Sequence, residues 1–169
     1  MSNLRIREES TEDVQAIRDV NRLAFAQDAE GRLVDRLRDE GYARVSLVAE
    51  VDGRVVGHIL FSDLPVITDD RTIPAVALAP MAVVPDHQRR GIGSALVRAG
   101  LDACKQGGYR LAMVLGHRAF YPRFGFSSAL ARQIDAPYGG EDFMAVELEP
   151  GAIAGMRGRV TYPPPFAEV

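Results

Sequence analysis

The chain has 169 residues, of which 47% are hydrophobic and 25% charged, and its net charge at neutral pH is −3. This length and balance are typical of one globular domain with its own core, so we expect a single domain over residues 1–169. The slightly negative charge argues against nucleic acid as a partner. No apolar run reaches the roughly 18 residues that span a bilayer, and the charged N-terminus does not resemble a signal peptide. We therefore expect no membrane partner and a cytoplasmic location.

Cysteine and histidine usage gives no sign of a metal or a disulfide. Cys104 is the single cysteine, so an internal disulfide is excluded, as is usual in a reducing compartment. It falls in an apolar helical stretch, which favours a buried structural residue over a catalytic thiol. His58, His87 and His117 lack the spacing of a shared metal site, so we predict no metal.

The first forty residues predict a strand and two helices. Apolar and charged residues alternate over Leu4–Glu8, as in a half-buried strand. Capping oxygens at Ser10–Asp13 then introduce a helix that should reach about Phe25. A second helix with an apolar face follows and should stop near Gly41.

A hairpin and a long strand come next. Asp52-Gly53 joins the apolar runs Val45–Val51 and Arg54–Phe61, and this dipeptide is the strongest local hairpin signal. The following strand, Ile73–Val84, contains Pro80, which cannot donate a hydrogen bond to a neighbouring strand. We interpret Pro80 as a point where the sheet opens. The alternative is that this strand lies at an edge of the sheet.

The second half of the chain predicts a βαβ unit and further strands. A helix over residues 91–107 leads to the continuous apolar run Leu111–Leu115, which is typical of a strand buried on both faces. Phe143–Leu148 predicts a later strand, and we expect residues 150–169, with the proline run Tyr162–Phe166, to form an extended segment packed on the domain. Together these elements predict an α/β (α+β) fold with a mixed, mostly antiparallel sheet of six to seven strands flanked by helices.

The stretch between the predicted strand and helix carries the most informative motif, MAVVPDHQRRGIGS, at residues 81–94. Closely spaced glycines let backbone amides converge, and a helix N-terminus adds partial positive charge, which together suit a pyrophosphate. A dinucleotide fold would need Gly or Ala where Leu96 stands, and a phosphate-binding P-loop would need Lys after Gly93. The plainest alternative is a glycine turn that only joins the two elements.

Within this stretch, Gln88-x-x-Gly91-x-Gly93 closely resembles the acyl-CoA motif of GCN5-related N-acetyltransferases, the GNAT family. The resemblance implies that the chain takes acetyl-CoA as a co-substrate, with the pantetheine arm paired to a splayed central strand. The cofactor-binding residues that it implies are Met81, Ala82, Val83, Arg89, Arg90, Gly91, Ile92, Gly93 and Ser94.

A second match lies at Tyr121-Pro-Arg-Phe-Gly125-Phe126, which is similar to the family's Tyr-x-x-x-Gly-Phe. The longer run Gly116–Phe126 resembles that of a subgroup of acetyltransferases whose substrates are unsettled. The resemblance makes Tyr121 the catalytic acid for the leaving thiolate and places Gly125 and Phe126 at the start of a strand. The alternative is a tyrosine whose ring only fills the core. Val114 stands where many members carry a pantetheine-contacting Asn, and that contact is assigned to no residue.

The resemblance implies an N-acetyltransferase in which an amine of a small molecule or protein attacks the thioester directly, with an oxyanion held by amides of residues 82–84. A carboxylate acting through water is the expected base, and the sequence does not choose among Glu30, Glu50 and Asp63. Residues that we expect near the acceptor are Phe25, Phe61 and Tyr138. The alternative function is a catalytically inactive acyl-CoA sensor or regulatory module. The oligomeric state stays open, a homodimer included.

Overall fold

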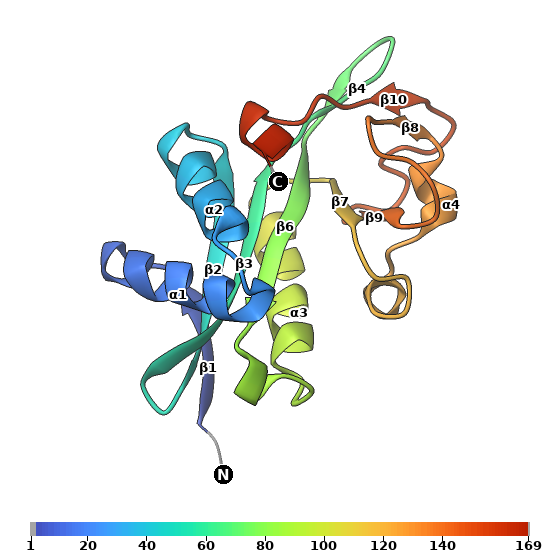
Figure 1. Cartoon of the computed structure of the whole chain (residues 1–169). Coiled ribbons are helices and arrows are strands. Elements are labelled where there is room, and N and C mark those ends of the chain that lie inside the picture. Colours follow the sequence, from blue (N-terminus) through green and yellow to red (C-terminus); the bar gives the residue numbers. More distant parts are fainter. Residues whose placement is uncertain (1–2, 169) are drawn as a thin grey trace.

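The computed structural model describes residues 3–168 and contains a six-stranded main sheet in the order β1-β2-β3-β6-β7-β9 (Figure 1). Within this sheet only β6 and β7 are parallel, and its other neighbouring pairs are antiparallel. This confirms the mixed, mostly antiparallel sheet that the sequence predicts. The strands are Leu4–Glu8 (β1), Ala43–Val51 (β2), Arg54–Asp63 (β3), Ala75–Val83 (β6), Leu111–Leu115 (β7) and Phe143–Glu147 (β9).

Helices cover both faces of this sheet. One face packs against α1 and α2 through a core that contains Ile17, Leu37 and Leu60. The other packs against α3, where Leu96 and Val97 meet residues of β2, β3 and β6. The helices are Val14–Phe25 (α1), Ala29–Asp39 (α2), Ile92–Gln106 (α3) and Ser128–Ala131 (α4), and the short 3-10 segments are Thr11–Asp13 (η1), Pro85–His87 (η2), Tyr121–Phe124 (η3) and Pro164–Glu168 (η4). None of the helices within residues 3–168 is both long and apolar enough to cross a membrane.

The hairpin between β2 and β3 forms as predicted. Asp52 and Gly53 both adopt positive φ, 51° and 83°. This is the backbone that a two-residue turn of the favoured twist requires, and Asp-Gly adopts it at low cost. The hairpin sets the register of the two strands that lie under α1 and α2.

A second, smaller sheet was not predicted. It has the order β5-β4-β10-β8, and three of its strands, β4, β10 and β8, are labelled in Figure 1. Each of its strands has only two residues. Strands so short carry no periodic pattern, so sequence reasoning misses them. They are Val66–Ile67 (β4), Thr72–Ile73 (β5), Ile134–Asp135 (β8) and Gly158–Arg159 (β10).

Three local predictions need correction. The strand expected over Ile73–Val84 is divided at Pro74 into β5 and β6, because proline has no amide hydrogen for the ladder. Gly125 does not begin a strand: it ends η3 with φ +94°, and α4 follows shortly after. The C-terminal proline run is not wholly extended either, because η4 forms there and Phe166 is buried against α2.

The main sheet opens between β6 and β7. The two strands pair over Ala75–Leu78 and Leu111–Val114, and beyond Leu78 strand β6 has a neighbour only on its β3 side. The register between β3 and β6 is irregular at this point, next to Pro80. The opening predicted at Pro80 is therefore confirmed, and the edge-strand alternative is wrong, since β6 lies between β3 and β7 in the sheet.

Candidate functional site

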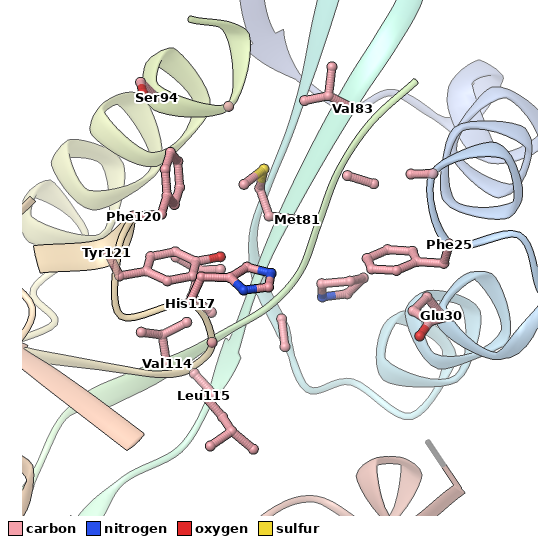
Figure 2. A pocket seen from close by; sticks show the side chains of 18 of the residues that line it. Phe25, Glu30, Met81, Val83, Ser94, Val114, Leu115, His117, Phe120 and Tyr121 are labelled. Carbon is pink, nitrogen blue, oxygen red and sulfur yellow. The ribbon is translucent and has the colours of Figure 1, made fainter. Parts of the chain in front are cut away.

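A cavity of about 1180 Å³ lies where β6 and β7 part (Figure 2). Strand β6 and the end of β7 line it centrally. The first turns of α3 and the segment after β7 line one side, and residues of α1 and α2 line the other. The C-terminal residues Tyr162 and Phe166 also reach it. The opening of the sheet thus creates a cleft that several distant parts of the chain line together.

The N-terminus of α3 is built to bind an anion. Gly91 caps it with φ +84°, and no side chain caps the helix. The first intrahelical bond runs from the Ala95 amide to the Gly91 carbonyl, at 3.0 Å, so the amides of residues 92–94 have no partner within the helix. The helix dipole adds partial positive charge at the same place.

Two arginines flank this cradle of amides without being neutralised. Arg89 adopts φ +63°, and both Arg89 and Arg90 are exposed. Neither makes an ion pair with another residue in the part of the chain that the structure describes. Two free cations beside uncapped helix amides favour a highly charged anion such as a diphosphate.

The backbone of β6 offers unpaired hydrogen-bonding groups toward the opening. The Val84 amide donates to the Val56 carbonyl at 2.9 Å, across the β3–β6 ladder. Since bonded and non-bonded pairs alternate in an antiparallel ladder, the Ala82 amide also faces β3, whereas the amides of Met81 and Val83 face the cavity. The expectation that the Val84 amide stabilises an oxyanion is therefore wrong, because that amide is already bonded.

The Tyr121 ring is held rigidly at the first residue of η3. It makes edge-to-face contacts with Phe120 and Phe126, with ring centroids 5.0 and 5.7 Å apart. A methyl group on Gly116 would lie 2.6 Å from its Cε2 atom, so the ring rests directly on the backbone there. Figure 2 shows the hydroxyl end of Tyr121 directed toward the side of the cavity where Phe25 lies. Burial raises the pKa of Tyr121 to about 12.

The cavity brings together most of the residues that the sequence singles out. Two of them do not line it: Arg90 is exposed outside it, and the Ile92 side chain is buried in the core, although its amide belongs to the cradle. The predicted residues that line it are Met81, Ala82, Val83, Arg89, Gly91, Gly93, Ser94 and Tyr121.

Of the three candidate bases, only Glu30 lines the cavity. Glu50 forms an ion pair with Arg7 at 2.7 Å, and Asp63 lies 3.6 Å from Arg44. Both of these carboxylates are thus held by arginines away from the cavity.

The aromatic residues expected near the acceptor divide similarly. Phe25 and Tyr138 line the cavity. Phe61 does not: it is fully buried under α3, where a methyl group on Gly100 would come within 2.2 Å of its Cε1 atom. The prediction for Phe61 is therefore wrong, because its side chain points to the opposite face of the sheet from α1 and α2.

Sequence reasoning gave no role to two residues that shape the site. The Gln88 side chain donates to the Val83 carbonyl at 2.9 Å and so ties the turn to the end of β6. Phe120 lies between Gly93 and Tyr121 and lines the cavity. Gln88 belongs to the quoted motif, and Phe120 is the aromatic residue that precedes Tyr121, so both were visible as patterns without an assigned contact. Within residues 3–168, no group of three or more His, Cys, Asp or Glu side chains is arranged to hold a metal ion.

Comparison with known proteins agrees with this geometry. Residues 5–129 match the family model described as an acetyltransferase (GNAT) domain. The uncharacterized N-acetyltransferase YhbS of Escherichia coli (strain K12) is 35% identical over 160 residues, which are 93% of this chain and 95% of that protein.

Two solved structures are similar over nearly the whole chain. The Escherichia coli GNAT family N-acetyltransferase YhbS in complex with CoA has a TM-score of 0.89 and 34% identity, covering 99% of this chain and 93% of that one. A GNAT family acetyltransferase from Brucella melitensis in complex with acetyl-CoA has a TM-score of 0.79 and 34% identity, covering 97% and 98%. The chain therefore belongs to the GNAT acetyltransferase family.

Proposed function

We propose that this protein transfers an acetyl group from acetyl-CoA to an amine by direct attack. The observation that carries the proposal is one cavity that joins an uncapped helix N-terminus, free strand amides and the Tyr121 hydroxyl. Acetyl-CoA presents the matching groups in the same order: a diphosphate for the helix N-terminus, an amide-bearing pantetheine arm for the strand, and a thioester sulfur for the Tyr121 hydroxyl. The similar Escherichia coli and Brucella melitensis structures, in complex with CoA and acetyl-CoA, support this choice of ligand.

In this proposal the main chain binds the acetyl donor. The amides of residues 91–94 receive the pyrophosphate, and Arg89 and Arg90 add positive charge. The pantetheine arm lies along β6 and pairs with the backbone of Met81 and Val83, while Ala82 contributes only to the wall. Pairing of a ligand with an open strand edge satisfies backbone groups that would otherwise be unbonded in a closed site.

The chemistry needs one new bond and one broken bond. The amine nitrogen attacks the thioester carbonyl carbon, the C–S bond breaks, and the proton that the amine loses is balanced by one that the CoA thiol gains. The pantetheine arm uses the Val83 amide and the Met81 carbonyl, so the Met81 amide, which also faces the cavity and lies farther from the pyrophosphate, is the proposed oxyanion donor, a role worth roughly 3 kcal/mol. The Tyr121 hydroxyl donates a hydrogen bond to the departing sulfur.

Calorimetry with acetyl-CoA and a Tyr121→Phe variant test this function. Wild type and variant should bind acetyl-CoA equally, and only the variant should lose turnover in a thiol-release assay across amine classes. Tyr42→Phe is the matched control, since Tyr42 packs against the α2 core and does not line the cavity. Failure of wild type to bind acetyl-CoA below millimolar concentration would contradict the whole assignment.

The same variant decides against the sensor alternative. A sensor that only binds acyl-CoA should keep both affinity and behaviour when the Tyr121 hydroxyl is removed. Wild type that binds acetyl-CoA and releases no thiol with any amine would favour the sensor.

A further inference from the structure

Glu30 is a carboxylate placed in the cavity without a cation. It is the one Asp or Glu among the residues that line the cavity within the described chain, and it belongs to the first turn of α2. The Gln27 side chain donates to both of its carboxylate oxygens, at 3.0 Å each. No arginine, lysine or histidine of the described residues pairs with it. Because a carboxylate has about four acceptor positions, the Gln27 amide orients Glu30 and leaves room for a further donor.

The aromatic residues that share the cavity with Glu30 suit an organic cation. Phe25 lies with Glu30 on the α1–α2 side of the cavity, opposite Tyr121 (Figure 2). Tyr162 contacts Tyr138 and Phe166 edge to face, with ring centroids 4.8 and 5.2 Å apart, and all three line the same cavity. Aromatic faces attract cations and repel anions.

The arginines that line the cavity lie elsewhere, and its two histidines, His87 and His117, lie on the same side as the arginines, in the segments before α3 and after β7. Arg89 belongs to the turn before α3, and Arg123 lies over the Phe120 ring at 5.2 Å from its centroid. Both are on the side that we assign to the acetyl donor. The charge of the cavity is therefore divided: positive where a diphosphate would bind and negative where the acceptor would enter.

An acceptor with only one amine group would not keep an ion pair with Glu30 during the reaction. The attacking nitrogen must be neutral when it reaches the thioester carbon, so it cannot keep an ion pair with Glu30 in the transition state. A second amine on the same molecule stays protonated and can keep that pair throughout. The side chain of Glu30 has no cationic partner among residues 3–168, and such a partner is what a second ammonium group would supply.

We propose that Glu30 binds the distal ammonium of a small diamine whose other amine is acetylated. This inference rests on the proposed function and names its acceptor class. Glu30 is then a positioning residue that fixes specificity, and its effect should appear mainly in KM for the acceptor.

A panel of three four-carbon amines tests the proposal with acetyl-CoA as donor. The probes are 1,4-diaminobutane, butylamine and 4-aminobutanoate, which share a reacting amine and differ in the charge at the far end. Wild type should prefer the diamine to butylamine by at least about tenfold in kcat/KM and should use 4-aminobutanoate least. Glu30→Gln should remove the preference for the diamine by raising its KM, and Glu30→Arg should shift the preference to 4-aminobutanoate. Asp39→Asn is the matched control, since it removes one exposed negative charge from the same helix outside the cavity.

The outcomes separate this inference from the proposed function. Equal use of the three amines by wild type would overturn the diamine assignment, as would a kcat loss in Glu30→Gln that is equal for all three, which identifies a general base instead. Turnover of none of the three by a protein that binds acetyl-CoA would also overturn it while leaving acetyl-CoA binding intact. Calorimetric titration of 1,4-diaminobutane into the protein alone measures binding at Glu30 without any acetyl transfer. Binding that Glu30→Gln abolishes supports the inference even if acetyl-CoA is not the donor. Absence of binding to wild type contradicts the inference.

Discussion

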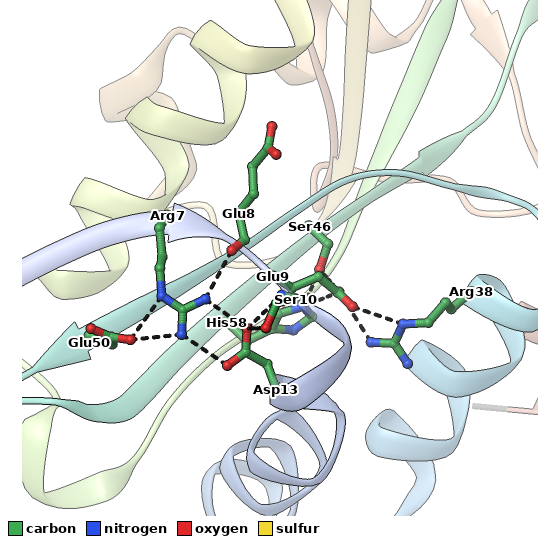
Figure 3. Close-up of polar contacts among 9 residues, drawn as sticks. All are labelled: Arg7, Glu8, Glu9, Ser10, Asp13, Arg38, Ser46, Glu50 and His58. Atoms are coloured by element: carbon green, nitrogen blue, oxygen red, sulfur yellow. Dashed lines mark hydrogen bonds and ion pairs between the residues drawn. The ribbon is translucent and has the colours of Figure 1, made fainter.

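Replacing His58 with Gln should flatten the pH dependence of folding stability. His58 lies on β3 and is fully buried, and burial lowers its pKa from 6.5 to about 4. The nearby Glu9 carboxylate acts in the opposite direction and does not compensate for burial, and Arg38, which binds Glu9, adds to the lowering (Figure 3). Asp13 also raises the pKa and has the smallest effect of the four. His58 is thus neutral in the folded protein at pH 7.

The hydrogen bonds agree with a neutral imidazole. Ser46 donates its hydroxyl proton to Glu9, so the contact between Ser46 Oγ and His58 Nε2, at 2.8 Å, has the histidine as donor. The other ring nitrogen, Nδ1, has no partner among the described residues. A second proton, on Nδ1, would have no hydrogen-bond acceptor among the described residues, so the charged ring would be buried with that N–H unsatisfied.

The sign and size of the effect follow from the two pKa values. The unfolded chain protonates His58 near pH 6.5 and the folded chain only near pH 4, so the unfolded state binds the extra proton between them. Stability therefore falls as pH falls through this interval. The loss attributable to His58 is about 2 kcal/mol from pH 7 to pH 5 and about 3 kcal/mol at pH 4.

Urea unfolding followed by far-UV circular dichroism measures this directly, since the chain has no tryptophan for fluorescence. The glutamine amide can still donate to Ser46 from near the Nε2 position but does not titrate. The difference in unfolding free energy between wild type and His58→Gln should change by about 2 kcal/mol between pH 7 and pH 5. An equal slope in both proteins would refute the reasoning, as would a wild-type change below about 0.5 kcal/mol that leaves no room for a buried neutral histidine.

Three further outcomes are expected. Gly116→Ala should lower kcat by about 10- to 100-fold with acetyl-CoA affinity unchanged in calorimetry, because its methyl group, 2.6 Å from Cε2, displaces the Tyr121 ring; unchanged kcat would contradict the packing of that ring. Since burial raises the pKa of Tyr121 to about 12, its hydroxyl stays protonated through pH 10, and kcat/KM should show no alkaline fall by that pH; a fall with an apparent pKa near 10 that Tyr121→Phe removes would contradict this. Gly100→Ala should destabilise the fold by about 1–3 kcal/mol in urea titrations, because the added carbon comes within 2.2 Å of Phe61, whereas Gly139→Ala, with no atom within 4 Å, should meet no such clash.

The features that could be predicted from the sequence are those that local backbone chemistry decides. Asp52 and Gly53 take positive φ because aspartate and glycine are residue types that tolerate it, and Gly91 does the same at the start of α3. Pro80 cannot donate to a ladder, whatever the rest of the fold does, so it marked the opening of the sheet correctly. Of these positions, Pro80 and Gly91 line the cavity, which is why two short motifs were enough to locate it.

The features that were missed depend on partners far away in the sequence. Strand β10 pairs with β4 and β8 through two residues, Gly158 and Arg159, and nothing local distinguishes them from a loop. Gly125 was expected to start a strand, yet the chain turns there and forms α4 before it reaches β9. Tertiary pairing decides both cases, and a pattern of five residues or fewer does not encode it.

The three carboxylates that the sequence offers as bases show the same limit for functional residues. Glu30, Glu50 and Asp63 are equivalent as residue types, and no pattern in the sequence distinguishes them. The structure separates them because Arg7 comes from β1 and Arg44 from the start of β2, each placed by sheet register beside a different carboxylate. A carboxylate whose cation comes from a distant strand is invisible to motif reasoning, and so is one that has none.

The environment of Tyr121 also limits how it can assist the leaving group. Its pKa of about 12 is roughly 3.5 units above that of an ordinary thiol, so complete proton transfer to the thiolate is uphill by about 5 kcal/mol. With an unperturbed phenol the same transfer costs about 2 kcal/mol. Burial of the ring therefore favours a hydrogen bond to the developing thiolate over full proton donation. A hydrogen bond to a charged group is worth about 1.5–3 kcal/mol, which sets the loss in Tyr121→Phe at about 10- to 150-fold in kcat. A larger loss would mean that the proton is fully transferred, and that the bound substrate lowers the pKa of Tyr121 well below its value in the free protein.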